Sequence, residues 1–173
     1  RSPPNQTSKT FQFKAAIVDH GSIDPTAGYN QTFIQTATNT LKQAGHTVDY
    51  YQGEEVTVEF YRNLPTHNYS IIILRVHSTA THVGGTESSV TLLTSENVSQ
   101  TKYVCEQLTD QLVSVSYHPD ERKRGIIYFG IRPLFVTQAM KGRFQNTIIL
   151  VMGCEGLNNP LMAKAFVERG AEV

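Results

Sequence analysis

Two short and almost uninterrupted apolar runs limit the folds that this chain can adopt. Residues 70–76 have the sequence Ser-Ile-Ile-Ile-Leu-Arg-Val, and residues 147–152 have the sequence Thr-Ile-Ile-Leu-Val-Met. A strand with one face in water alternates apolar and polar residues, whereas a strand covered on both faces is apolar nearly throughout. The two runs therefore predict central strands of a mainly parallel sheet that is covered on both faces.

Strand and helix patterns alternate along the rest of the chain. Residues 11–18 and 46–51 predict two further strands, and apolar residues at helical spacing predict a helix from Phe33 to Ala44 that ends at Gly45. Further helices are expected over residues 56–64, 101–113, 133–140 and 160–169, with short strands over residues 89–93 and 126–131. This order predicts an α/β fold, a three-layer α/β/α sandwich with right-handed crossovers.

The two ends of the chain depart from this regular pattern. Residues 1–10 are polar and contain Pro3 and Pro4, so we expect a flexible lead-in. The length of 173 residues suits one domain, which we assign to residues 11–173. Residues 171–173 have the pattern of a strand that is only beginning. We therefore expect the last strands of the sheet to be missing or supplied by another chain; the alternative is a natural terminus at Val173.

Charge and hydropathy argue against nucleic acid and membranes as partners. Lys and Arg together number 15, as do Asp and Glu, and the formal net charge is zero. The longest run of like charge covers only residues 122–124. Neither a nucleic-acid backbone nor an anionic membrane surface is therefore expected as the main partner. No apolar stretch approaches the roughly 18–20 residues of a membrane span.

Cysteine and histidine usage predicts no metal and no cofactor. The chain contains Cys105 and Cys154 and has no CxxC pair. His82 lies five residues after His77, but no carboxylate or cysteine stands at ligand spacing from the two. Cys105 falls on an apolar helical face with Leu108, so we expect it to be a buried structural thiol. A disulfide between the two cysteines is an open alternative.

Four Asn-x-Ser/Thr sequons favour an extracellular or cell-surface protein, because such sequons accept N-glycans in the secretory pathway. The sequons begin at Asn5, Asn30, Asn68 and Asn97. The alternative is that all four are accidental in a chain rich in serine and threonine.

Each of the two predicted central strands ends at a reactive side chain. His77 directly follows residues 70–76, and Cys154 follows residues 147–152 after Gly153. The carboxyl ends of parallel strands meet at one edge of a sheet, so neighbouring strands would bring the imidazole and the thiol side by side. A nearby imidazolium favours the nucleophilic thiolate. Taken singly, the cysteine is more often an inert apolar residue and the histidine a structural hydrogen-bonding group.

Two sequence segments around these residues resemble the motifs of a known peptidase group. Ile-Ile-Ile-Leu-Arg-Val-His-Ser (residues 71–78) and Ile-Ile-Leu-Val-Met-Gly-Cys-Glu-Gly (residues 148–156) look like the His and Cys motifs of clan CD cysteine peptidases. That group includes caspases, metacaspases, legumain, gingipains, clostripain and separase. Residues 162–171 are similar to the helix that follows the nucleophile in many members.

The resemblance implies a caspase-hemoglobinase-like fold, a dyad of Cys154 and His77, and cleavage of peptide bonds in a peptide or protein substrate without a cofactor. It also implies an oxyanion hole built from the backbone N–H groups of Ser78 and Cys154. A C-terminal segment or chain, like a caspase small subunit, would complete the sheet and the substrate pocket.

Three departures from the group's pattern bear on these expectations. The group usually has His-Gly, where this chain has His77 and Ser78, and it often has Ala before the cysteine, where this chain has Gly153. The spacing of 77 residues between His77 and Cys154 also exceeds the roughly 50 typical of caspases. Caspase specificity therefore cannot be transferred.

The substrate pocket in this group lies at the loop after the first strand and beside the nucleophile. Here those regions hold Asp19, Asp24 and Glu155 and no arginine, which predicts a preference for Arg or Lys in the substrate. The alternative is that Asp24, before Pro25, forms a turn and that Asp19 caps a loop. With a basic preference, the exposed-looking residues 121–124 (Glu-Arg-Lys-Arg) become a candidate site of self-cleavage.

Two other functions fit the same pattern. One is a catalytically inactive caspase-like binding or scaffold domain, which Ser78 in place of glycine favours. The other is a flavodoxin-like small-molecule binder, which shares the strand and helix order. The chain has no GxGxxG sequence and no glycine-rich phosphate loop after the first strand.

Overall fold

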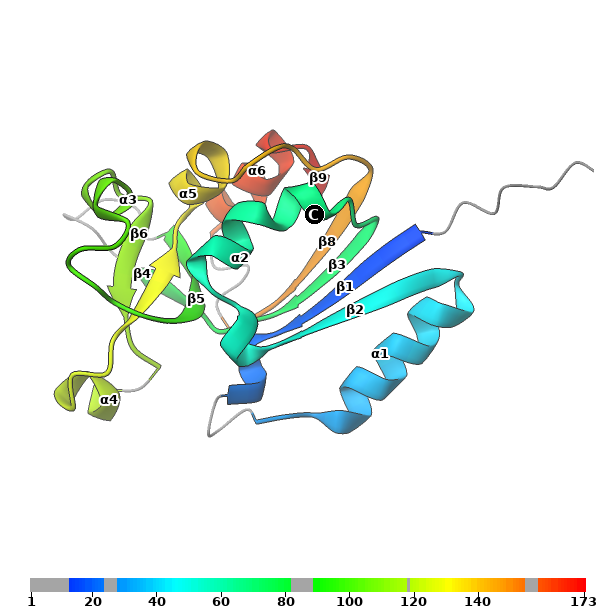
Figure 1. Cartoon of the computed structure of the whole chain (residues 1–173), viewed down its shortest axis with the longest axis horizontal. Helices are drawn as coiled ribbons and strands as arrows, with labels where there is room; N and C mark the ends of the chain where they lie inside the picture. Colours follow the sequence, from blue (N-terminus) through cyan, green and yellow to red (C-terminus); the bar gives the residue numbers. More distant parts are fainter. Residues whose placement is uncertain (1–12, 24–27, 82–88, 118, 155–158) are drawn as a thin grey trace, which may run out of the picture.

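The computed structural model describes residues 13–23, 28–81, 89–117, 119–154 and 159–173 (Figure 1). The predicted lead-in lies outside these residues, as do Asp24, His82 and Glu155. No helix within the described ranges combines the length and the apolar character that a membrane span requires.

A five-stranded parallel sheet forms the centre of the fold, in the order β2-β1-β3-β8-β9. Its strands are β1 (Phe13–Asp19), β2 (His46–Gln52), β3 (Ile71–Arg75), β8 (Thr147–Met152) and β9 (Ala171–Glu172). The two continuous apolar runs are β3 and β8, which pair with each other in the middle of the sheet. The predicted α/β fold with a mainly parallel sheet is confirmed.

A second sheet, antiparallel and four-stranded, packs beside the first in the order β4-β5-β7-β6. Its strands are β4 (Ser78–Thr81), β5 (Ser89–Asn97), β6 (Leu112–Val115) and β7 (Tyr128–Ile131). Both short strands expected in this region are present. The helix expected over residues 101–113 is wrong in its second half, because α3 covers only Val104–Leu108 and Asp110 adopts a left-handed conformation with φ of 60°. Leu112 and Val115 are then buried in β6, paired with β7.

Helices pack on both faces of the parallel sheet (Figure 1), but one face of β8 stays uncovered, so the expectation that both apolar runs are covered on both faces is wrong for this strand. On one face α1 (Gln31–Gln43) buries Ile34 and Leu41 against Ala15 and Ile17 of β1. The helix begins where Asn30 Oδ1 accepts a hydrogen bond from the N–H of Phe33 at 2.9 Å.

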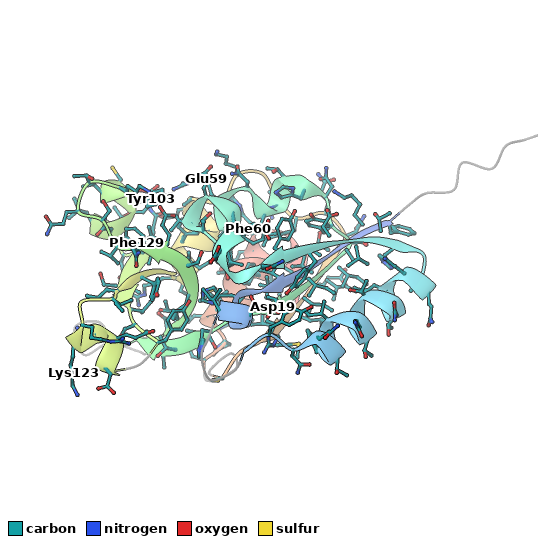
Figure 2. All side chains as sticks on the ribbon, turned by 60° about the horizontal axis from the view of Figure 1, so that its bottom comes forward. Asp19, Glu59, Phe60, Tyr103, Lys123 and Phe129 are labelled. Carbon is teal, nitrogen blue, oxygen red and sulfur yellow. The ribbon has the colours of Figure 1, made fainter. Side chains whose placement is uncertain are left out.

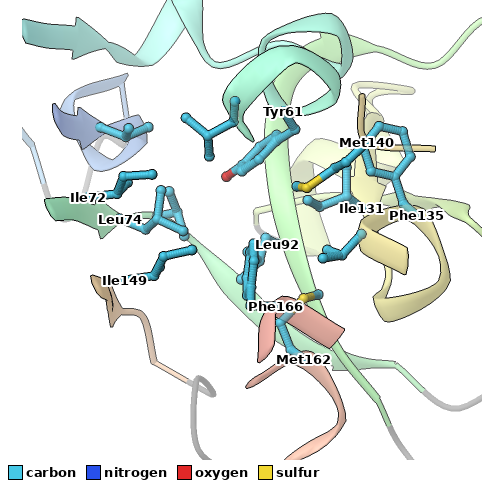
Figure 3. Close-up of a cluster of buried hydrophobic side chains, with 14 of the residues drawn as sticks. Tyr61, Ile72, Leu74, Leu92, Ile131, Phe135, Met140, Ile149, Met162 and Phe166 are labelled. Carbon is cyan, nitrogen blue, oxygen red and sulfur yellow. The ribbon is translucent and has the colours of Figure 1, made fainter. Parts of the chain in front are cut away.

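The opposite face carries the larger core, which the antiparallel sheet helps to close. Ile72 and Leu74 of β3 and Ile149 of β8 pack there with Leu92 of β5 and Phe166 (Figure 3). The helices on this face are α2 (Val58–Asn63), α5 (Pro133–Gln138) and α6 (Leu161–Glu168).

Three 3-10 turns and a short helix complete the fold. They are η1 (His20–Ile23) after β1, η2 (Gly53–Glu55) after β2, η3 (Leu64–His67) before β3, and helix α4 (Pro119–Lys123). The turns η1 and η2 extend the edge of the sheet at which β3 and β8 end, which is the edge where the sequence predicts a site.

One local expectation is wrong, and a second is confirmed only in part. Cys105 is exposed, because α3 buries none of its five residues and leaves Leu108 82% exposed, so the apolar face predicted for this segment points into solvent. The segment around residues 121–124 is a short helix with mixed exposure. Lys123 extends outward from α4 (Figure 2), whereas Glu121 is buried.

Candidate active site

The two predicted catalytic residues follow directly paired strands. Arg75 of β3 stands opposite Met152 of β8, and the N–H of Val76 donates to the carbonyl of Met152 at 3.1 Å. His77 lies two residues beyond Arg75, and Cys154 lies two residues beyond Met152. The two chains therefore deliver His77 and Cys154 to the same edge of the sheet in matching register, and the predicted adjacency of the two strands is confirmed.

The side chain of Cys154 is exposed, so a reagent in solvent can reach its thiol. His77 is half-buried, its carbonyl accepts the N–H of Leu93 at 2.9 Å, and its ring meets the ring of Tyr117 edge-on at 5.1 Å. The structure therefore offers an exposed thiol and a histidine ring in contact with an aromatic neighbour at the same edge of the sheet.

Ser78 and Gly153 fill one space between the two strand ends. Ser78 is buried, and a β-carbon on Gly153 would overlap its Oγ and lie 2.9 Å from the carbonyl oxygen of Val76. Only glycine fits beside this serine. The residues that depart from the clan CD pattern are thus neighbours in space.

An aromatic cluster contacts the ring of His77. The hydroxyl of Tyr117 is hydrogen-bonded to Nε2 of the buried His20 at 2.5 Å, and the two rings stack at 5.4 Å. Tyr128 packs edge-on against Tyr117 at 4.8 Å. Tyr117 therefore links the end of β1 with the end of β3. Neither tyrosine carries a sequence signal for this position, since the antiparallel sheet brings both to the site.

Asp19 lies where β1 passes into η1 (Figure 2) and is fully buried. Its Oδ1 forms an ion pair with Nη1 of Arg75, and its Oδ2 accepts the hydroxyl of Tyr50 at 3.1 Å. Arg75 also donates from Nη2 to the carbonyl of Gly28 at 3.0 Å. Burial, followed by the negative charge of Asp19, raises the pKa of Tyr50. The charge of Asp19 is thus balanced inside the fold, and its predicted contact with substrate stays a prediction.

The other two predicted substrate residues, Asp24 and Glu155, lie outside the described residues. Among the residues that the structure does describe, no group of three or more His, Cys, Asp or Glu side chains is placed to hold a metal ion. Within the described residues, the sheet edge brings together the exposed thiol of Cys154 and the half-buried imidazole of His77.

Comparison of this chain with protein-family models, with curated proteins and with solved structures finds no match. The assignment of function therefore depends on the geometry of the site and on the motif resemblance.

Proposed function

We propose that this chain is a cysteine endopeptidase of the clan CD type, with Cys154 as nucleophile and His77 as its acid–base partner. The observation that supports this most directly is the matched position of the two residues, each two positions beyond the Arg75–Met152 pair on adjacent strands. The exposure of the thiol and the quoted motifs add to it.

The reaction would proceed in two steps, acylation of Cys154 and hydrolysis of the resulting thioester. The thiolate of Cys154 attacks the carbonyl carbon of the peptide bond, and the backbone N–H groups of Ser78 and Cys154 hold the negative oxygen. The C–N bond breaks, His77 gives its proton to the leaving amine, and a thioester remains. Water, deprotonated by His77, then hydrolyses the thioester and returns the thiol.

A further chain segment, like a caspase small subunit, belongs to the same proposal. Ile148, Leu150 and Met152 alternate along one face of β8 and are 42%, 50% and 46% exposed. Three large apolar side chains in a row on a central strand favour a covering element. Co-purification of a second polypeptide with the chain would support this part of the proposal.

An extracellular or cell-surface location completes the proposal. The sequon asparagines Asn30 and Asn68 are exposed, as N-glycan acceptors must be. Mass spectrometry of the native protein after enzymatic glycan removal tests this location.

Thiol reactivity tests the dyad, and Cys105 supplies an internal reference because it is also exposed. A chloroacetamide or iodoacetamide probe should label Cys154 at least about tenfold faster than Cys105, since a thiolate reacts and a neutral thiol does not. His77→Ala should remove the difference. Equal labelling rates in the unaltered chain would contradict an activated nucleophile.

Peptide hydrolysis tests the reaction itself. A positional peptide library should be cut by the complete protein, including any further segment that joins this chain, left intact by Cys154→Ala, and cut normally by the control Cys105→Ser. Ser78, at the position where the group usually has glycine, favours one second candidate, an inactive binding domain of the same fold. A chain that labels no faster at Cys154 and cuts no peptide would be that domain.

A further inference from the structure

A cavity of about 350 Å³ opens beside the aromatic cluster that contacts His77. It lies between the short turns after β1 and β2 on one side and the antiparallel sheet with α4 on the other. Its lining residues are Ile23, Glu54, Ser95, Asn97, Tyr117, Glu121 and Tyr128. Tyr117 both lines the cavity and contacts the ring of His77, so it connects the cavity with the candidate site.

A buried and electrically unbalanced carboxylate faces this cavity. Glu121 is only 9% exposed, and its Oε2 accepts the N–H of Tyr117 at 3.1 Å. Within the described part of the chain it makes no ion pair, although a buried carboxylate is normally paired with a cation. Its negative charge, after burial, raises the pKa of Tyr128. Glu121 can therefore pair with a cationic group that enters the cavity.

The rest of the lining suits a cation as well. Glu54 adds a second carboxylate, and no lysine or arginine of the described residues lines the cavity. The positive charge of Arg124 lowers the pKa of Tyr128 and so opposes the effect of Glu121. Arg124 is not among the residues that line the cavity. Tyr117 and Tyr128 also line the cavity, and aromatic rings attract ammonium and guanidinium groups independently of carboxylates.

We propose that this cavity is the subsite that receives a lysine or arginine side chain of the peptide cleaved at Cys154. The inference rests on the proposed peptidase function and assigns its basic preference to Glu121 and Glu54. The cationic group would pair with the free oxygen of Glu121 and with Glu54, against the two tyrosine rings. These residues come from η2, α4, β7 and the segment after β6, and differ from Asp19, Asp24 and Glu155.

A binding experiment tests the subsite without requiring catalysis. N-acetyl-arginine amide and its neutral isostere N-acetyl-citrulline amide are titrated into the full chain carrying Cys154→Ala, and the NMR signals of the Tyr117 and Tyr128 rings are followed. The arginine compound should shift both signals and the citrulline compound should bind about 10- to 100-fold more weakly, as expected for loss of a charged hydrogen bond. Equal binding of the two compounds overturns the subsite.

Matched variants locate the effect. Glu121→Gln keeps an oxygen for the N–H of Tyr117 but removes the charge, and should abolish the preference for arginine over citrulline. Asp120→Asn changes the net charge equally from the adjacent, solvent-exposed position and should leave the preference intact. Glu54→Gln, at an exposed position, gives a second removal of charge that does not challenge folding. An unchanged preference in both glutamate variants overturns the assignment.

Hydrolysis separates failure of the subsite from failure of the proposed function. Peptides that differ only in arginine or citrulline are compared by kcat/KM, and the ratio should fall about tenfold or more in Glu121→Gln. Hydrolysis with an unchanged ratio overturns the subsite alone. Binding of the arginine compound with no hydrolysis of any peptide overturns the peptidase proposal, on which the substrate role of the cavity depends.

Discussion

Ser78 occupies the space that a side chain on Gly153 would need, and this contact joins the ends of β3 and β8 directly beside His77 and Cys154. Clan CD motifs usually place glycine after the histidine and often place alanine before the cysteine. In this chain the larger residue follows the histidine and the glycine precedes the cysteine. The two departures therefore compensate each other within one packed volume, and Ser78 is compatible with the same strand spacing.

Swapping the two residues tests this compensation. Gly153→Ala alone should destabilise the fold by about 1–3 kcal/mol, because the new methyl group overlaps Ser78. The double variant Ser78→Gly/Gly153→Ala should recover the part of that loss that comes from the overlap with Ser78, while the close contact with the carbonyl oxygen of Val76 remains. A double-mutant cycle measured by urea unfolding should therefore give a coupling energy of about 1 kcal/mol. Additive effects of the two single variants would contradict a shared volume.

The central sheet could be predicted from the sequence because its signal is local. An unbroken apolar run of strand length is visible in a few consecutive residues, and β3 and β8 both satisfy it. The common position of His77 and Cys154 at one edge of the sheet follows from parallel pairing, so this part of the candidate site could also be predicted from the sequence. The burial of Cys105 was predicted wrongly, because apolar spacing alone does not tell whether a short helix has a partner surface to pack against.

The outer part of the site could not be predicted, because it depends on contacts between distant segments. Tyr117 lies 97 residues from His20 in the sequence. The antiparallel sheet that brings the two together has only weak strand patterns in the sequence. Glu121 belongs to a strongly charged segment that resembles an exposed loop. Its burial arises from tertiary packing, in which its carboxylate accepts the N–H of Tyr117.

A buried hydroxyl in the larger core offers a test of the packing. Tyr61 is fully buried, and its Oη has no hydrogen-bond partner within the described part of the chain (Figure 3). Burial raises the pKa of this phenol. Tyr61→Phe should leave the free energy of unfolding unchanged or raise it by about 1 kcal/mol, since an unsatisfied polar group is removed.

Tyr69→Phe is the matched control for Tyr61. The hydroxyl of Tyr69 donates to Asp49 at 2.6 Å and is hydrogen-bonded to the hydroxyl of Tyr51 at 2.7 Å. Its removal should destabilise the fold by about 1–2 kcal/mol. The two variants are compared by denaturant unfolding, and a larger loss for Tyr61→Phe would mean that its hydroxyl has a partner.

Alkaline titration gives a third prediction. Burial, followed by the charge of Glu96 and a hydrogen bond to it, raises the pKa of Tyr103 to about 12 from its usual value of 10.0. Above pH 10 the unfolded chain loses the phenolic proton while the folded chain retains it. Stability from this group is therefore present below pH 10 and is lost as the pH rises toward 12. Tyr103→Phe should flatten this part of the pH profile of unfolding.

The pair Asp19–Arg75 should respond unequally to removal of either partner. Asp19 is fully buried, whereas the side chain of Arg75 keeps 16% exposure and also bonds the carbonyl of Gly28. Arg75→Gln leaves a carboxylate without its cation and should cost about 3–5 kcal/mol, the usual cost of breaking a buried pair. Asp19→Asn leaves an arginine that water can partly solvate, and should cost about 1–3 kcal/mol. Equal losses in urea unfolding would contradict this asymmetry.

The same Asp19→Asn variant decides between two origins of a basic preference. Because the carboxylate of Asp19 is already bound to Arg75 and Tyr50, its replacement should leave the ratio of kcat/KM for arginine and citrulline peptides unchanged, while Glu121→Gln lowers it. A ratio that falls in Asp19→Asn but holds in Glu121→Gln would instead assign the preference to the end of β1, as the sequence predicts. Folding of both variants is verified by their melting temperatures before the rates are compared.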